Sequence, residues 1–448
     1  MSAVLQDPHV KGIVLSGGPQ SIHDQGVRID HWLAEVSCPI LGICYGMQAL
    51  AAACGAKVAS GTSGEYGKAR IQLQPSSLWS RVPSHVDTCD VWMSHMDAVQ
   101  VCPEAFDVIA SSEHAPIAGF AHREKPWFGL QFHPEVMHSE YGDAMIASFV
   151  LDQCQCAGDW QTSLVLDEMV KAISNQVGEE EVILGLSGGV DSSVLAALCH
   201  RAIGDQLTCV MVDTGLLRLN EVEEVMASIH HAMPIKIEVV DAKSRFFQAL
   251  KGIHDPEEKR KICGRLFVEV FEEAASSFHG RAQWLAQGTI YPDVIESAGH
   301  GLNAAQVIKS HHNVGGLPEK HGFTLLEPLS QLFKDEVRAF GLALGLPQAL
   351  IVRHPFPGPG LCVRVLGEVT ADKVSLIQKC DAIFLEVLRQ HDLYKHSAQA
   401  LAVLLPVNSV GVKGDQRVYG PVVALRSVTT EDFMTADWSR IPFDVLAE

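Results

Sequence analysis

The feature that most constrains this chain is a glycine-rich turn between an apolar β-type run and a helical pattern. The run Val182–Leu186 leads into Ser187-Gly-Gly-Val-Asp-Ser-Ser193, and a helix is predicted over Ser193–Ala202. Consecutive glycines let backbone N–H groups approach phosphate oxygens, and a helix N-terminus adds a favourable dipole. The turn therefore predicts a phosphate site, with a ligand-free serine-capped turn as the alternative. No Lys follows the glycines as in a Walker A loop, so γ-phosphate hydrolysis is not indicated.

Strand-like runs alternate with helical patterns along most of the chain, which predicts an α/β fold with parallel sheets. We expect two doubly wound parallel-sheet domains, 1–155 and 156–352, and a small C-terminal α+β dimerisation domain, 353–448. The predicted strands are Gly12–Leu15, Pro39–Ile43, Trp127–Phe132, Val182–Leu186, Leu207–Val212, Ile235–Val240, Trp284–Ala286, Leu325–Leu329, Cys362–Leu366, Ala400–Leu405 and Pro421–Val428. The predicted helices, besides Ser193–Ala202, are Met47–Ala53, Asn220–Ala232, Arg260–Ser277, Lys334–Leu344 and Ala371–Leu388. The proline-rich run His354–Gly360 predicts a rigid linker.

Composition excludes several classes of protein. A hydrophobic fraction of 47% is ample for packed cores, and the net charge of −19 disfavours a nucleic-acid surface or an anionic membrane as partner. The sequence has no apolar run of transmembrane length and no signal peptide, so we expect a cytoplasmic location. The 12 cysteines do not have the spacing of a secreted disulfide scaffold and are expected to be free thiols.

A candidate nucleophile occupies a second glycine-flanked turn. In Gly42-Ile-Cys44-Tyr-Gly46 the cysteine stands between a predicted strand and a predicted helix, as in a nucleophile elbow. A buried cysteine in a glycine-rich turn is the alternative. His133 and Glu135, in Gly129-Leu-Gln-Phe-His-Pro-Glu135, can supply the base and the group that orients it. The glycine turn Ser16-Gly-Gly-Pro19 offers N–H groups for an oxyanion.

These three motifs, SGGP, GICYG and QFHPE, resemble those of the class I glutamine amidotransferases over residues 12–150. The resemblance implies that Cys44 attacks the glutamine carboxamide, with His133 as base and then acid and Glu135 orienting it. The residues implied around glutamine are Gly18 and Tyr45, as oxyanion donors, and Gln48, Ser94 and His95. Met96 stands where relatives usually have glycine, which places a side chain beside this expected pocket.

The turn at 187–193 resembles the SGGxDS fingerprint of the ATP-pyrophosphatase family, which cleaves ATP between its α- and β-phosphates. The implied ATP contacts are Ser187, Gly188, Gly189, Val190, Asp191, Ser192 and Ser193, with Val212 near the adenine. Asp191 is the implied ligand for Mg²⁺. Lys334 is a candidate for neutralising phosphate charge, and a solvated lysine at a helix end is the alternative.

Further motifs downstream, among them Lys259-Arg-Lys-Ile-Cys-Gly-Arg265 and Arg353-His-Pro-Phe-Pro-Gly-Pro-Gly360, resemble those of the bacterial GMP synthetases. The resemblance implies a carbon–nitrogen ligase that converts XMP, ATP, glutamine and water into GMP, AMP, pyrophosphate and glutamate through adenylyl-XMP. The candidate contacts for XMP are Arg265, Asp293, Lys309 and Asp415.

The C-terminal segment resembles the dimerisation domain of this family, and an apolar sheet face in so small a unit predicts a homodimer. Members have a further βαβ stretch before position 12 and continue after position 448 into a Lys-Pro-Pro-x-Thr-x-Glu-Trp-Glu type motif. The resemblance thus implies that the chain is shortened at both ends. Two alternatives to a complete synthetase stay open: an ammonia-dependent ligase with a defective glutaminase, and an inactive nucleotide-binding dimer.

Overall fold

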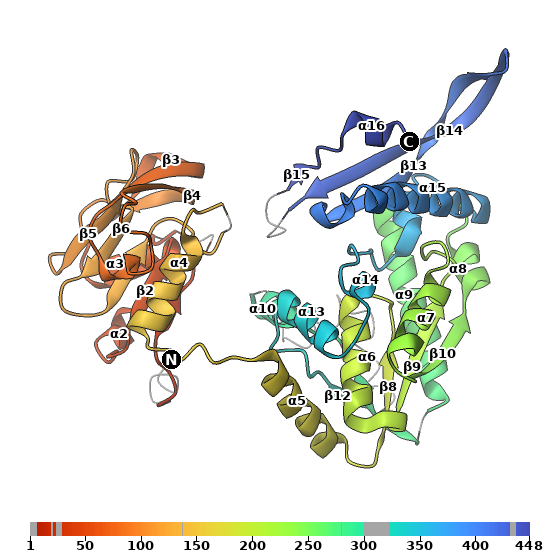
Figure 1. The fold of residues 1–448 in the computed structure, drawn as a ribbon, viewed down its shortest axis with the longest axis horizontal. Coiled ribbons are helices and arrows are strands. Elements are labelled where there is room, and N and C mark those ends of the chain that lie inside the picture. The colour runs from red at the N-terminus through yellow and green to blue at the C-terminus, as the bar shows by residue number, and fades with distance from the viewer. Residues whose placement is uncertain are drawn as a thin grey trace. The chain divides into compact units, whose positions relative to one another are not determined.

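The computed structural model describes residues 7–18, 21–23, 29–136, 138–278, 280–299, 322–430 and 436–448. The chain forms two compact units, Met1–Asp159 and Trp160–Glu448 (Figure 1), and each is described by itself. No helix within the described ranges is long and apolar enough to cross a membrane. The predicted division into three domains stays a prediction.

A mixed sheet in the order β1-β2-β7-β6-β5-β3-β4 forms the centre of the first unit. Its strands are β1 (Ile13–Leu15), β2 (Ile40–Ile43), β3 (Val58–Leu73), β4 (Thr88–Val99), β5 (Phe106–Ser111), β6 (Gly119–His122) and β7 (Trp127–Leu130). Its helices are α2 (Asp30–Leu33), α3 (Tyr45–Ala53), η1 (Ser77–Trp79), α4 (Gly142–Ala147) and η2 (Ser148–Gln153). Strand β2 contributes Leu41 and Ile43 to one core cluster and Ile40 to the other, because successive side chains point to opposite faces.

The second unit contains a sheet of parallel strands in the order β10-β9-β8-β11-β12. Its strands are β8 (Glu181–Gly185), β9 (Leu207–Asp213), β10 (Lys236–Asp241), β11 (Ala282–Ala286) and β12 (Thr324–Leu326). Its helices are α5 (Thr162–Val177), α6 (Val190–Ile203), η3 (Gly204–Gln206), α7 (Glu221–Ala232), α8 (Lys243–Ala249), α9 (Pro256–Ser276), α10 (Tyr291–Gly299), α13 (Lys334–Ala343) and α14 (Gln348–Ile351). Val182 and Leu184 of β8 pack with α6, whereas Ile183 packs with α9 on the other face, so helices cover both faces.

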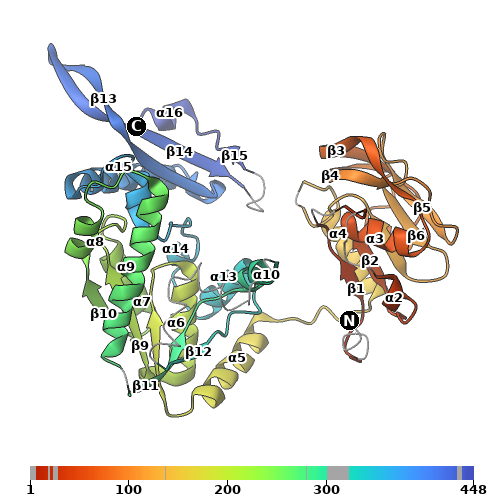
Figure 2. The same cartoon turned by 180° about the vertical axis from the view of Figure 1, so that it is seen from behind.

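The C-terminal part of the second unit is α+β. It comprises η4 (Gly360–Arg364), α15 (Ala371–Gln390), η5 (Tyr394–His396), β13 (Gln399–Lys413), β14 (Gln416–Thr429), β15 (Asp437–Trp438) and α16 (Phe443–Leu446). The three strands form an antiparallel sheet in the order β13-β14-β15. Helix α15 packs against β13, and the β13–β14 hairpin extends beyond this helix (Figure 2).

The α/β class and the C-terminal α+β unit predicted from the sequence are confirmed, with three local corrections. In the first sheet only the pairs β1–β2 and β2–β7 are parallel, and the pairs that join β7, β6, β5, β3 and β4 are antiparallel. The predicted strand Cys362–Leu366 is wrong, since 360–364 forms a 3-10 helix. The run 354–360 is packed within the second unit, where His354 is buried and stacks on Tyr394 at 3.8 Å between ring centroids.

A buried carboxylate joins the C-terminal helix to its surroundings. Asp381 of α15 is 2% exposed and accepts hydrogen bonds from Arg364 Nη1 at 3.0 Å and from the backbone N–H of Ala402 at 2.9 Å. Arg218 Nε lies 4.0 Å from its second oxygen. Burial lowers the pKa of both arginines, and Asp381 opposes this effect by favouring their charged forms. This cluster fixes α15 against η4 and the loop after β9.

Replacing Asp381 by Ala is expected to destabilise the second unit strongly, because two buried guanidinium groups lose their carboxylate. The free energy of unfolding should fall by about 3–5 kcal/mol, measured by urea unfolding followed by tryptophan fluorescence. The exposed Asp372 on the same helix provides a matched control. D372A should change the free energy of unfolding by no more than about 1 kcal/mol. Equal effects of the two substitutions would contradict this assignment.

Candidate active site

Cys44 occupies a sharp turn between β2 and α3. Its backbone has φ 50° and ψ −109°, a conformation that costs a non-glycine residue about 1–3 kcal/mol. The neighbouring glycines make the turn possible: a Cβ on Gly46 would lie 1.9 Å from the carbonyl oxygen of Leu15, and one on Gly42 would lie 2.7 Å from the backbone of Gly46. The strained cysteine is therefore held by close backbone packing that only glycine permits.

His133 lies between Cys44 and Glu135. Its Nδ1 is 2.7 Å from Glu135 Oε1, which leaves the other ring nitrogen for Cys44. Two hydrogen bonds raise the pKa of His133 to about 10. The bond to Cys44 makes the larger contribution, and the bond to Glu135 makes the smaller one. The ring is then protonated at neutral pH and places a positive charge beside the cysteine. The three predicted catalytic residues are thus brought together as a Cys–His–Glu arrangement.

Side-chain amides surround Cys44 on its buried side. Gln131 Nε2 donates to Cys44 Sγ at 3.8 Å, and Gln48 Nε2 donates to Gln131 Oε1 at 3.3 Å and to the carbonyl of Asp97 at 2.7 Å. The carbonyl of Ser94 lies 3.6 Å from Cys44 Sγ. Gln48 and Ser94, both predicted to border glutamine, therefore lie in this network around the thiol.

The other residues predicted around glutamine have different settings. The His95 ring is buried and contacts the carbonyl of Asp97 at 3.1 Å and Glu65 Oε2 at 3.3 Å. Gly18 is exposed at the end of the turn after β1, and Tyr45 is the first residue of α3. Met96 is 48% exposed, which agrees with a side chain at the surface of the strand.

The glycine turn after β8 is ordered by its own serines. Helix α6 begins at Val190, not at Ser193, because Gly189 serves as the N-cap. Ser193 is 1% exposed and donates to the carbonyl of Gly189 at 2.8 Å, while the hydroxyls of Ser187 and Ser192 lie 2.9 Å apart. The first turn of α6 thus faces the end of β8, as a phosphate-binding turn requires.

Lys334, at the start of α13, contacts this turn. Its Nζ donates to both carboxylate oxygens of Asp191 at 2.7 Å. A pocket of about 350 Å³ opens over the turn and includes Val212 at the end of β9. Its other described lining residues include Ser187, Gly188, Gly189, Val190, Asp191, Thr214, Arg218, Glu221, Phe267, Lys334, Arg338 and the run Arg353–Gly358. Most of the predicted ATP contacts therefore line one pocket, whereas Ser192 and Ser193 are not among its lining residues.

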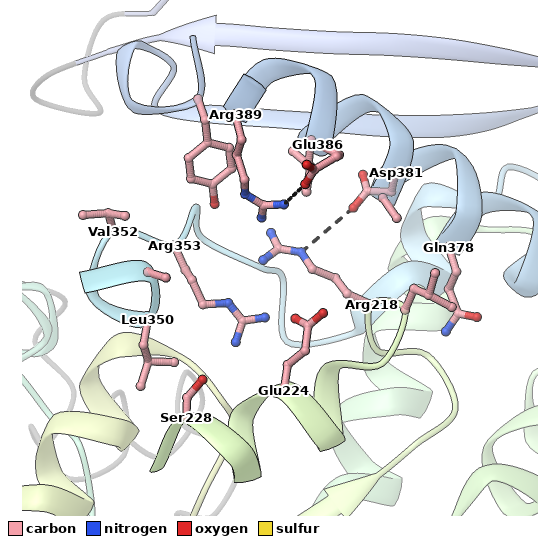
Figure 3. A pocket seen from close by; sticks show the side chains of 15 residues that line it. Arg218, Glu224, Ser228, Leu350, Val352, Arg353, Gln378, Asp381, Glu386 and Arg389 are labelled. Atoms are coloured by element: carbon pink, nitrogen blue, oxygen red, sulfur yellow. Dashed lines mark ion pairs between the residues drawn. The ribbon is translucent and has the colours of Figure 1, made fainter. Parts of the chain in front are cut away.

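A second cavity, of about 590 Å³, shares Arg218 and Arg353 with this pocket. In Figure 3 the side chains of Arg353 and Arg218 reach toward its centre from opposite sides, and Arg389 points into it from α15. Arg353 also donates to the carbonyl of Gly188 at 3.2 Å and to Glu221 at 2.7 Å. Its side chain therefore connects the glycine turn to α7.

Comparisons with known proteins agree with this combination of sites. The glutamine amidotransferase class-I family matches residues 2–153, the NAD synthase family matches 164–265, and the GMP synthase C terminal domain matches 386–448. A GMP synthase [glutamine-hydrolyzing] from Francisella philomiragia subsp. philomiragia is 54% identical over 444 residues, which is 99% of this chain and 86% of the relative. The chain belongs to the glutamine-hydrolysing GMP synthase family.

Further proteins are similar to this chain or to part of it. The GMP synthase [glutamine-hydrolyzing] of Francisella tularensis subsp. tularensis is 52% identical over 99% of this chain and 86% of its own length. A solved glutamine amidotransferase from Thermotoga maritima is 24% identical and covers 32% of this chain and 64% of its own, with a TM-score of 0.26. The predicted GMP synthase family and its ligase class are confirmed.

The candidate XMP contacts within the described residues come from three separate elements. Arg265 is exposed on α9 and pairs with Glu269 at 3.3 Å, and Asp293 accepts from the N–H of Ile290 at 2.9 Å in the first turn of α10. Asp415 lies at the tip of the β13–β14 hairpin with φ 62°. None of these three is among the described residues that line the pocket over the glycine turn. Lys309 lies outside the described residues.

Some residues at these sites carry no strong sequence signal. Arg218 lines the pocket from the segment between β9 and α7, and Glu221 lines it from the first residue of α7, where a charged surface turn is the ordinary interpretation. Phe267 lines it from α9, but its apolar spacing is that of a core residue. Gln131 is different, because it belongs to the QFHPE motif and could have been identified as a partner of Cys44.

The protonation of His133 can be measured directly. In a chain with ¹⁵N-labelled histidine, the His133 ring is expected to lose its proton as the pH rises through about 10, above the ordinary value of about 6.5. Cys44→Ala removes the larger cause, so the pKa should fall while Glu135 still holds it above the ordinary value. His122, whose pKa is lowered by burial, serves as an internal reference that C44A leaves in place. A His133 that titrates near 6.5 in the native chain contradicts the proposed contact.

Proposed function

We propose that this chain is a glutamine-dependent GMP synthase in which the first unit releases ammonia from glutamine and the second unit activates XMP with ATP. The observation that carries the proposal is the Cys44–His133–Glu135 arrangement on the same chain as the ordered glycine turn at 187–193. Membership of the GMP synthase family at 54% identity supports it.

Cys44 is the nucleophile of the glutaminase step in this proposal. Its thiolate attacks the carboxamide carbon, and the oxyanion that forms is stabilised by the N–H groups of Gly18 and Tyr45, with the α3 dipole adding to this effect. Protonated His133 then gives its proton to the departing nitrogen, which leaves as ammonia. The neutral ring next takes a proton from the water that hydrolyses the thioester, and glutamate is released. Glu135 keeps the ring oriented throughout.

The glycine turn holds the pyrophosphate of ATP in the second step. The XMP oxygen on C2 attacks the α-phosphorus and pyrophosphate leaves, so negative charge develops next to the N–H groups of the turn and the α6 N-terminus. The Lys334 ammonium lies at the same turn and stabilises this charge. Ammonia then replaces the adenylyl oxygen at C2, giving GMP and AMP.

Asp191 is the described carboxylate best placed for Mg²⁺. Mg²⁺ commonly uses one or two carboxylates together with substrate phosphates, so a single carboxylate at the glycine turn suits an ion that arrives with ATP. When bound, the ion would neutralise charge on the departing pyrophosphate. Asp191 would hold it, and Lys334 orients that carboxylate.

The remaining assignments concern the acceptor and the assembly. We assign Arg265, Asp293, Lys309 and Asp415 as XMP contacts. A homodimer through the C-terminal sheet is supported by its exposed apolar side chains, which include Val410, Val412 and Tyr419. We also propose a cytoplasmic location.

Cys44→Ala separates the two half-reactions. With XMP, ATP and Mg²⁺, C44A is expected to lower the glutamine-dependent rate of GMP formation by about 10⁴-fold or more, because the nucleophile is absent. With ammonium as nitrogen donor it should retain the native rate. Cys54→Ala, a cysteine that follows α3, is the matched control and should leave both rates unchanged.

Either of two results contradicts the proposal. Failure of the native chain to form GMP with both nitrogen donors would reject the synthase function. Activity with ammonium alone would reject the glutaminase and favour an ammonia-dependent ligase.

Lys334→Met tests the pyrophosphate site. Loss of one charged hydrogen bond to phosphate is expected to raise the KM for ATP by about 10–100-fold, with ammonium as nitrogen donor so that Cys44 is not involved. Asp191, left without its partner, would repel the phosphates and add to this effect. The exposed Lys171 on α5 provides the control, and K171M should match the native chain. An unchanged KM in K334M would identify Lys334 as a solvated side chain.

A further inference from the structure

Two buried thiols outside the glutaminase site face each other in the second unit. Cys263 of α9 and Cys362 of η4 are 3% and 0% exposed, and their Sγ atoms are 3.4 Å apart. A disulfide has an S–S length of about 2.05 Å, so the sulfurs need to approach by only about 1.4 Å. Neither residue takes part in the proposed reaction.

The two thiols differ in their hydrogen bonds. Cys362 donates to the carbonyl of Pro359 at 3.0 Å, so Cys263 is the donor in the contact between the sulfurs. That hydrogen bond, assisted by Lys259, lowers the pKa of Cys362, whereas the same bond and burial raise the pKa of Cys263. One thiol of the pair is thus prepared to act as a nucleophile and the other to resolve the product, as in a redox-sensitive pair.

Lys259 supplies positive charge to the same region. It is 1% exposed, and its Nζ donates to the carbonyls of Cys362, Val365 and Gly367 at 3.3, 2.7 and 2.6 Å. These bonds join α9 to the segment after η4 and hold the backbone of Cys362 opposite Cys263. The sulfur contact is therefore part of a tightly bonded junction.

This junction lies next to the pocket over the glycine turn. Phe267 stands one helical turn after Cys263 and lines the pocket, and the run 353–358 just before η4 lines it as well. In η4, which follows that run, Leu361 donates its N–H to the carbonyl of Leu216 at 2.7 Å. A covalent bond between Cys263 and Cys362 would therefore tie together two walls of the same pocket.

We propose that Cys263 and Cys362 form a reversible, peroxide-sensitive dithiol that cross-links these two walls when it is oxidised. The oxidant class is hydrogen peroxide, because so buried a pair excludes larger disulfide reagents. The Cys362 thiolate attacks one peroxide oxygen, the O–O bond breaks, and hydroxide leaves and is protonated to water, which gives a sulfenic acid. The Cys263 sulfur then attacks the Cys362 sulfur and the S–O bond breaks. The departing hydroxide takes the Cys263 proton and leaves as a second molecule of water. Two sulfurs each lose one electron, and the peroxide gains both.

The cross-link can be detected without any enzyme assay. The full-length chain is treated briefly with hydrogen peroxide, denatured in N-ethylmaleimide and digested. The expected product is a peptide pair joined through Cys263 and Cys362, lighter by two hydrogens and separated by dithiothreitol. Peroxide-treated chain in which both thiols are still alkylated, or in which Cys362 is oxidised without the cross-link, would overturn the proposal.

Single substitutions test the assigned order of the two steps. In Cys263→Ser the sulfenic acid on Cys362 has no resolving thiol, so a dimedone adduct should accumulate there. In Cys362→Ser the remaining Cys263 should stay reduced under the same treatment. Dimedone labelling of Cys263 in C362S, with none on Cys362 in C263S, would reverse the roles and overturn the mechanism. Cys380→Ser, in the neighbouring helix, is the control that should cross-link like the native chain.

The effect on the pocket is measured with ammonium as nitrogen donor, which removes oxidation of Cys44 from the readout. Because closure around a nucleotide requires its walls to move, the oxidised chain is expected to turn over at least about twofold more slowly and to recover in dithiothreitol. C263S and C362S should lack the dithiothreitol-reversible loss. If the cross-link forms and turnover does not change, the claim that oxidation restrains the two pocket walls is rejected. The peptide assay does not depend on GMP formation, so failure of the synthase proposal remains distinguishable from failure of this one.

Discussion

Both sites depend on the close backbone approach that glycine allows where a strand turns into a helix. In the first unit, the carbonyl of Leu15 occupies the position that a side chain on Gly46 would need, and this contact holds Cys44 at a positive φ. In the second unit, Gly188 has φ 76° and lies against Val225, so a side chain there would be both strained and crowded. The Cys44 turn and the glycine turn at 187–193 thus both lie at the carboxyl ends of parallel strands, and close backbone packing at glycine residues positions both of them.

The second unit adds a network of buried charges to this close packing. Arg353 joins the carbonyl of Gly188 to Glu221, and Arg218 lies between His354 and Asp381. Removal of either partner from a buried ion pair leaves an uncompensated charge, so such a network resists local rearrangement. The glycine turn is thereby connected through side chains to α15, a helix far along the sequence. The C-terminal segment is thus linked through Asp381 to Arg218, which lines the pocket over the glycine turn.

Local sequence predicted the buried strands and the motifs well, and it predicted tertiary effects poorly. Pro39–Ile43 and Leu207–Val212 were close to β2 and β9, because an apolar run bounded by turn residues carries its own signal. Cys362–Leu366 carries the same signal but is not a strand, since Gly360 at φ 65° packs against the carbonyl of Leu216 and directs the chain into a 3-10 turn. The β13–β14 hairpin is much longer than predicted, because its outer half is exposed and has no core pattern.

Local sequence also fails to report the tertiary contacts that form the sites. Cys44, His133 and Glu135 were identified because each stands in a short motif, whereas Arg218 depends on Asp381, which lies in a distant helix, and no local pattern reports that contact. Cysteine shows the point most clearly. Cys44 is set beside a protonated imidazole on a strained turn, while Cys263 and Cys362 are set against each other beside a buried ammonium. The residue type is identical at all three positions, so the chemistry assigned to each follows from neighbours that only the fold supplies.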